Sequence, residues 1–102
     1  MDTKSELTLL KEQAITATYL NDNKKALELI NAVLVSEPLS AEFAVEKAEI
    51  LCKMNDYEGA LAVLKEKVYD NPNLIEAELK KIKEEIEYEK LLPRGIKRYI
   101  TC

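Results

Sequence analysis

Carboxylates are the reactive side chains that this chain has in quantity. The 102 residues include 19 Asp and Glu, but only two cysteines and no histidine. A pair of carboxylates can divide the acid and base roles of a reaction between them, and Glu84, Glu85 and Glu87 form such a group. They lie among lysines at the charge-pair spacing of a helix surface. We therefore interpret them as a solvated helix face and not as an acid–base dyad.

Other kinds of catalytic site are excluded by composition. Without histidine the chain cannot form a Ser–His or Cys–His pair, and it lacks the commonest metal ligand. Two glycines cannot build a phosphate-binding loop, and the run 21–23 lacks the glycine and bidentate glutamate of a calcium loop. We expect Cys52 to be a small core residue. The sequence thus predicts no enzyme, no cofactor and no metal.

Composition also limits the partners. Apolar residues make up 47% of the chain and charged residues 33%, which suits a soluble helical protein. The net charge of −4 disfavours nucleic acid, because phosphate binding needs a basic surface. No apolar run approaches the ~20 residues of a membrane span, and the N-terminal sequence MDTKSELT lacks the apolar core of a signal peptide. We expect a cytoplasmic protein that binds neither nucleic acid nor membrane.

A repeated segment supplies the helices that position these side chains. Residues 20–38 (LNDNKKALELINAVLVSEP) and 54–72 (MNDYEGALAVLKEKVYDNP) align without a gap, 34 positions apart. Each copy has an Asn-Asp turn, a helical pattern of apolar residues and a final proline. An ungapped repeat of this length is typical of stacked helical hairpins.

The apolar spacing predicts five helices, separated by breaks at 21–23, Pro38, 55–56 and 70–72. The expected N-caps are Asp2 or Thr3 (with Ser5 and Glu6 as alternatives), Asp22 or Asn23, Ser40, Asp56 and Asn73. The fifth helix is expected to end by Leu91 or Leu92, before Pro93. The residues expected to face inward are Leu7, Leu10, Ala14, Ala17, Leu20, Ala26, Leu27, Ile30, Val33, Leu34, Phe43, Ala44, Val45, Ala48, Leu51, Tyr57, Ala60, Leu61, Leu64, Val68, Ile75, Leu79, Ile82 and Ile86.

Four pairs of residues in these helices resemble the tetratricopeptide repeat (TPR) family. Each first helix has a small residue, Ala14 or Ala48. Each second helix has an alanine, Ala26 or Ala60, followed four residues later by a bulky apolar residue, Ile30 or Leu64. Each hairpin ends at a proline, Pro38 or Pro72. The chain departs from the family in having Leu10 and Ala44 where an aromatic residue is common, which implies a shallower core. An ordinary helical bundle is the main alternative.

The resemblance implies an all-α fold, a right-handed α-solenoid of helical hairpins with about five helices. The whole chain, 1–102, would be a single domain. Its parts would be repeat 1 (about 7–40), repeat 2 (about 41–74), a capping helix (75–92) and a C-terminal tail (93–102).

In this family the first helices of successive hairpins line a concave groove. The resemblance places in that groove Lys11, Ile15, Tyr19, Glu42, Val45, Glu49, Cys52, Lys53, Leu79 and Lys83. The family's two-carboxylate clamp for a peptide C-terminus does not fit, because Ile15 and Glu49 stand where amides are needed. For Ile15, Tyr19 and Val45, a place in the core is equally open, and we favour the core for Leu79.

We therefore expect a non-catalytic protein–protein interaction module with a partly apolar, acidic groove. Its partner would be another protein, bound through an amphipathic helix or an extended segment. Two alternatives stay open. One is a small chaperone similar to those that hold needle subunits in type III secretion. The other is a self-associating structural module.

The C-terminal tail has three interpretations. A third repeat copy would place Arg94 and Arg98 where Ala60 and Leu64 stand, so we expect no further helical hairpin. The tail is basic and contains Ile96, Tyr99 and Ile100 as well as a terminal Cys102, which we expect to be exposed. It could fold back on the chain's own groove or fifth helix, form a homodimer with a second copy, or remain disordered.

Overall fold

The computed structural model describes residues 3–91, with side chains from residue 6 onward. This part of the chain contains five α-helices and no strand, which confirms the predicted all-helical fold. Predictions for the cap at Asp2, the tail 93–102 and Cys102 lie outside the described residues. The helices are α1 (Thr3–Tyr19), α2 (Asn23–Ser36), α3 (Ala41–Lys53), α4 (Tyr57–Lys65) and α5 (Pro72–Lys90).

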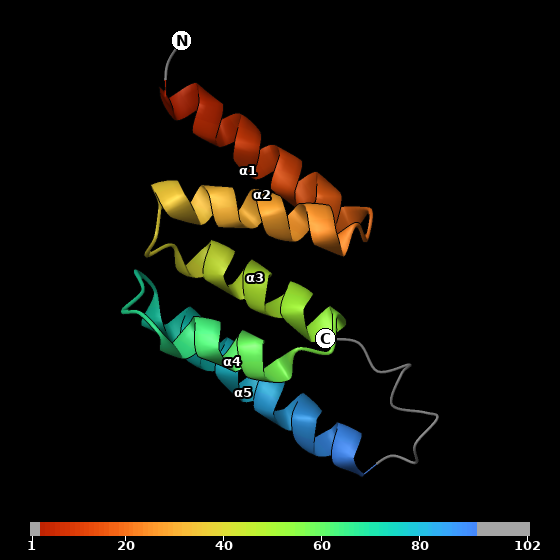
Figure 1. The fold of residues 1–102 in the computed structure, drawn as a ribbon. Coiled ribbons are helices and arrows are strands. Elements are labelled where there is room, and N and C mark those ends of the chain that lie inside the picture. The colour runs from red at the N-terminus through yellow and green to blue at the C-terminus, as the bar shows by residue number, and fades with distance from the viewer. Residues whose placement is uncertain (1–2, 92–102) are drawn as a thin grey trace.

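The two Asn-Asp turns have the same local geometry. Asn21 and Asn55 adopt positive φ angles of 58° and 65°, a conformation that asparagine tolerates better than most residues. Asp22 then caps α2 by accepting a hydrogen bond from the Lys25 N–H at 3.3 Å, and Asp56 caps α4 in the same way from Gly59 at 2.9 Å. Both caps were predicted, because a short oxygen-bearing side chain satisfies a free N–H of the first helical turn. The turns lie on the same side of the molecule (Figure 1).

Ser40 caps α3 as predicted, through the Phe43 N–H at 3.4 Å. The predicted cap of α5 at Asn73 is wrong, because Asn71 accepts the hydrogen bond from the Leu74 N–H at 3.2 Å. Pro72 can therefore occupy the first turn of α5, where a proline loses no helical hydrogen bond.

Two residues predicted to face inward are exposed, since each lies beyond the end of its helix. Leu20 follows the last residue of α1, and Val68 follows the early end of α4 at Lys65. Once the chain leaves the helix, helical periodicity no longer sets the direction of its side chains. Tyr69 is buried in place of Val68, and its hydroxyl donates a hydrogen bond to the Val63 carbonyl.

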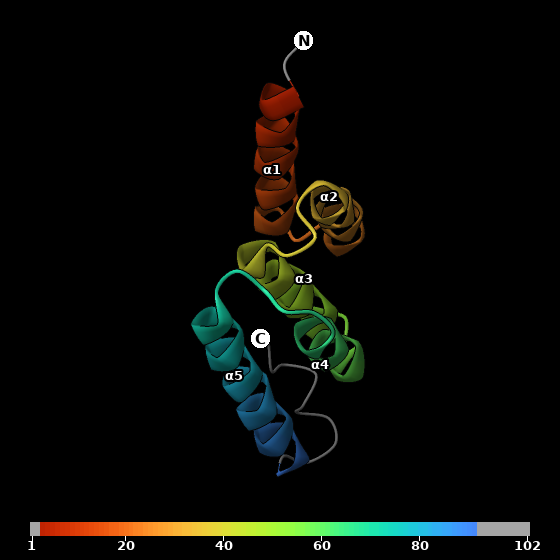
Figure 2. The same cartoon turned by 90° about the vertical axis from the view of Figure 1, so that its left-hand side faces the viewer.

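Consecutive helices pack as neighbours from α1 to α4, and α5 packs on both α3 and α4 (Figures 1 and 2). The core has two parts, and α3 contributes to both of them. The first joins α1, α2 and α3 through Ala14, Ala17, Ala26, Ile30, Val33, Phe43 and Ile50. The second joins α3, α4 and α5, with Tyr69 between α4 and α5, through Ala41, Ala44, Val45, Ala48, Cys52, Ala60, Leu64, Tyr69, Ile75 and Ile82. The sequence analysis did not single out Ile50, which is fully buried.

Asp70 ties the segment before α5 to the segment before α3. Its N–H donates to the Leu39 carbonyl at 3.0 Å, and its Oδ1 accepts from the Ala41 N–H at 2.9 Å. The carboxylate thus satisfies a free N–H at the start of α3 from a position 29 residues away.

Replacing Asp70 by alanine is expected to lower the free energy of unfolding by about 1–2 kcal/mol, because the Ala41 N–H loses a charged acceptor. Urea unfolding measures this change. Asp70→Asn is the matched control, since the amide keeps an acceptor oxygen in place and should retain part of the stability. An unchanged midpoint for Asp70→Ala would show that water replaces the bond without cost.

Candidate functional site

The residues predicted for the groove differ widely in exposure. Ile15 and Tyr19 on α1 are 44% and 84% exposed, and Glu42 and Lys83 are exposed as well. The half-buried members are Lys11, Glu49, Lys53 and Leu79. By contrast, Val45 and Cys52 are 9% and 2% exposed and belong to the second part of the core. These two residues therefore lie beneath the surface and do not present contact atoms to a partner, although burial confirms the core assignment of Cys52.

Lys11, Ile15 and Tyr19 follow one another at steps of four residues and so share one face of α1. The Lys11 ammonium lies 2.7 Å from Glu37 Oε1 and 5.8 Å from the centroid of the Phe43 ring on α3. Both contacts direct this face of α1 toward the start of α3. The two exposed apolar side chains thus continue a stripe that begins at the α1–α3 junction.

One face of α3 is acidic. Glu42, Glu46 and Glu49 follow one another at steps of four and three residues along the helix. Burial raises the pKa of Glu46, repulsion from Glu49 and Glu42 raises it further, and Lys53 offsets only part of this effect. Repulsion of this kind means that the negative charge on α3 is incompletely neutralised.

Glu78 of α5, a buried charged residue of the described chain, was not predicted as a site residue. It is 7% exposed, and its Oε2 has no hydrogen-bond partner among the described residues. Burial, followed by the negative charge of Glu49, raises the pKa of Glu78 to about 6. Its place between Ile75 and Ile82 on the apolar stripe was the signal that could have identified it.

The Nζ of Lys81 lies 3.8 Å from Oε1 of Glu49 and so links α5 to α3. This ion pair neutralises part of the charge on α3. It also shows that α5 lies along the acidic face of α3, because the two residues come from the middle of their helices.

The predicted groove residues fall into separate pockets. Lys11 and Glu42 help to line a polar pocket of about 700 Å³ between α1, α3 and the segment before α5. Leu79 and Lys83 help to line a pocket of about 630 Å³ along α5. The structure therefore brings two pairs of the predicted residues together, Lys11 with Glu42 and Leu79 with Lys83, in different pockets.

A further apolar surface was not predicted. Leu9, Leu20 and Leu29 line a pocket of about 430 Å³ on the outer side of α1 and α2. Leu9 corresponds to Phe43 one repeat later, and Phe43 is buried against the first part of the core. The repeat alignment was the signal that could have revealed this exposed end of the helical array.

The chemistry of the described residues gives no indication of a metal site. Among the described side chains, no group of three or more Cys, Asp or Glu residues could hold a metal ion. Over residues 3–91, every helix is too short or too polar to cross a lipid bilayer. Comparison of the chain with protein-family models, curated proteins and solved structures gave no match.

Proposed function

We propose that the five helices form a TPR-like solenoid of two hairpins and a capping helix. This proposal is supported by residues 34 positions apart that are buried to the same extent. Ala14 and Ala48 are both fully buried, and so are Ala26 and Ala60. A radius of gyration of 14.5 Å also favours an extended array, since a compact domain of this size would have about 13 Å.

On this fold the protein would act as a non-catalytic interaction module. We place the binding surface on the stripe of α1 and the acidic face of α3, with α5 at its far edge. Two observations carry the proposal. Ile15 and Tyr19 are exposed on the face of α1 from which Lys11 reaches Phe43 of α3, and the acids along α3 repel one another. Covering large exposed apolar side chains with a partner removes apolar surface from water and so favours binding.

The same surface indicates the chemistry of the partner. An amphipathic helix or extended segment could place apolar side chains on Ile15 and Tyr19. Basic residues of that segment would then approach Glu42 and Glu46, whose mutual repulsion they would relieve. Val45 and Cys52 are buried in the part of the core that joins α3, α4 and α5, so they would not touch this segment.

Two synthetic amphipathic peptides of equal length and identical leucine face, one with lysines and one with glutamates, test the proposal. We expect the lysine peptide to bind with a dissociation constant on the order of micromolar and to shift the amide NMR signals of α1 and α3. The glutamate peptide should bind at least tenfold more weakly, because it meets the acids of α3.

Tyr19→Ala should weaken binding of the lysine peptide about tenfold, as expected for an exposed aromatic anchor. Tyr88→Ala is the matched control, since Tyr88 is another exposed tyrosine but lies near the end of α5. Equal loss in both variants, or equal binding of both peptides, would contradict the proposal. A mass that increases with protein concentration in the absence of peptide would instead support self-association.

A further inference from the structure

Three glutamates of α5 each have an enclosed carboxylate oxygen without a hydrogen-bond partner among the described residues. They are Glu78, Glu85 and Glu89, and in each case the atom is Oε2. Their spacing of seven and four residues puts them on one face of the helix. Glu78 is more than nine-tenths buried. Enclosed carboxylates without a partner are costly, so this face indicates a missing cationic group.

The repeat shows what normally covers this face. Glu78 stands 34 residues after Ala44, and Glu85 stands 34 residues after Leu51. On α3 these positions belong to the part of the core that Ala60 and Leu64 of the following helix, α4, help to form. The equivalent positions of α1, Leu10 and Ala17, belong in the same way to the part of the core that α2 helps to form. The face of α5 that carries the glutamates is therefore the one that the next segment of the chain would cover.

The residues after α5 differ from their equivalents in α4, and their charge is complementary to that of the glutamates. Ala60 and Leu64 of α4 lie in the same part of the core as Ala44. The positions 34 residues later are Arg94 and Arg98. The apolar contact of the second hairpin is thus replaced by acids on one side and arginines on the other. Residues 92–102 include no acidic residue that could compete.

We propose that residues 92–102 of the same chain dock on the Glu78–Glu85–Glu89 face of α5, with Arg94 and Arg98 donating hydrogen bonds to its carboxylates. The planar guanidinium group suits this role, since it can donate two parallel hydrogen bonds to one carboxylate. The charged contact takes the place of the apolar helix pair found in the two preceding hairpins. The Glu78 end of this face borders the acidic face of α3, because the charge of Glu49 acts on Glu78. The two proposals still invoke different ligands, a separate peptide in one case and residues 92–102 in the other, so either proposal can fail alone.

The segment is long enough for this contact. Twelve residues of helix separate Glu78 from Lys90, which corresponds to roughly 18 Å at 1.5 Å per residue. Eleven extended residues, 92–102, span up to roughly 36 Å. The C-terminal half of α5 also projects beyond α3 and α4 (Figures 1 and 2).

A nitroxide spin label on Cys102 of the full chain tests the proposal. Cys52 is buried, so the reagent is directed to Cys102, and Cys102→Ser provides the unlabelled reference. We expect the label to broaden the amide NMR signals of residues 78–89 at least threefold more than those of α1. Equal broadening throughout the chain, or broadening centred on α1, would overturn the proposal.

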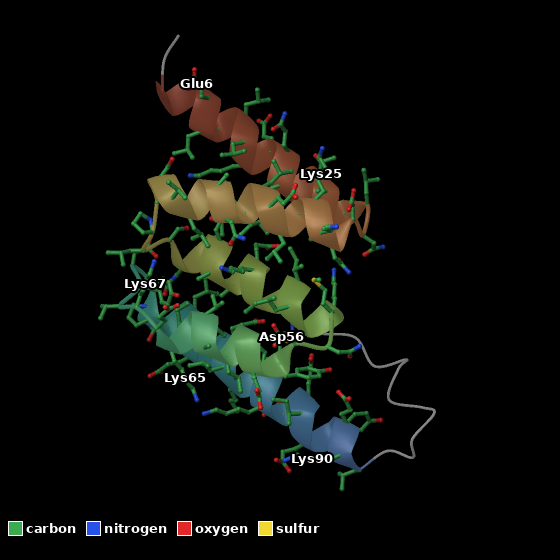
Figure 3. The ribbon with its side chains drawn as sticks, viewed as in Figure 1. Glu6, Lys25, Asp56, Lys65, Lys67 and Lys90 are labelled. Atoms are coloured by element: carbon green, nitrogen blue, oxygen red, sulfur yellow. The ribbon has the colours of Figure 1, made fainter. Side chains whose placement is uncertain are left out.

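Arg94→Glu combined with Arg98→Glu should abolish this selective broadening while the signals of α1 to α4 keep their positions. Lys65→Glu with Lys67→Glu is the matched control, because it changes the net charge by the same amount. Lys65 ends α4 and Lys67 follows it, and in Figure 3 both lie to the left, while Lys90 at the end of α5 lies lower and to the right. The control should keep the broadening, and its loss in both double variants would contradict a specific contact.

A mixture of isotope-labelled Cys102→Ser chains with unlabelled spin-labelled chains separates contact within one chain from contact between two. We expect no broadening in this mixture. Broadening of residues 78–89 there would assign the contact to a second copy and overturn docking within the chain.

Discussion

Ile82→Ala is expected to lower the free energy of unfolding by about 2–5 kcal/mol. Ile82 is fully buried and belongs to the part of the core that joins α3, α4 and α5. Removing its three outer carbons would lose apolar burial and leave a cavity that rigid neighbouring helices cannot fill. Since a domain of this size has a total stability of about 5–15 kcal/mol, this one change is expected to threaten the docking of α5.

Ile15→Ala is the matched control for this prediction. The same atoms are removed, but Ile15 is 44% exposed, so we expect a loss below about 1 kcal/mol. Urea unfolding followed by far-ultraviolet circular dichroism measures both changes. Equal losses in the two variants would contradict the assignment of Ile82 to the core and of Ile15 to the surface.

Ala48→Leu is expected to destabilise the protein by about 1–3 kcal/mol or more, for the opposite reason. Ala48 is fully buried, in the same part of the core as Ala60 of α4. Three additional carbons have no space there, so either the helices must separate or side chains must leave their preferred rotamers. The expected result is a lower midpoint of thermal unfolding, with weaker packing of α3 on α4.

Ala62→Leu provides the comparison, because Ala62 lies on the exposed side of α4. Leucine is nearly as good a helix former as alanine, so stability should change by less than about 0.5 kcal/mol. Ala14→Leu should resemble Ala48→Leu, because Ala14 is the fully buried equivalent one repeat earlier. Tolerance of leucine at both Ala14 and Ala48 would contradict the close packing of the hairpins.

Much of the helical framework could be predicted because its causes are local. An Asn-Asp pair favours a positive φ followed by a cap, and both Asp22 and Asp56 form those caps. Apolar residues at steps of three and four predicted the buried positions within the helices, with Ile30 and Leu64 as examples. These features depend on residues only a few positions apart, so a single sequence contains the information.

The errors occurred where a helix began or ended. Val68 lies three positions beyond Lys65, the last residue of α4, and it is exposed while Tyr69 is buried. The end of a helix depends on what the following loop contacts, and here Asp70 pairs with the segment before α3. A contact between residues 29 positions apart is not visible in local periodicity.

The sequence by itself determined the five helices, their turns and most of the residues that each helix buries. Only the tertiary structure decided which of the predicted groove residues are accessible. Lys11 and Val45 hold the same repeat position, yet Lys11 is half-buried while Val45 packs in one core with Ile75 and Ile82 of α5. The physical reason is that exposure depends on which helix lies across a surface, and α5 lies across α3.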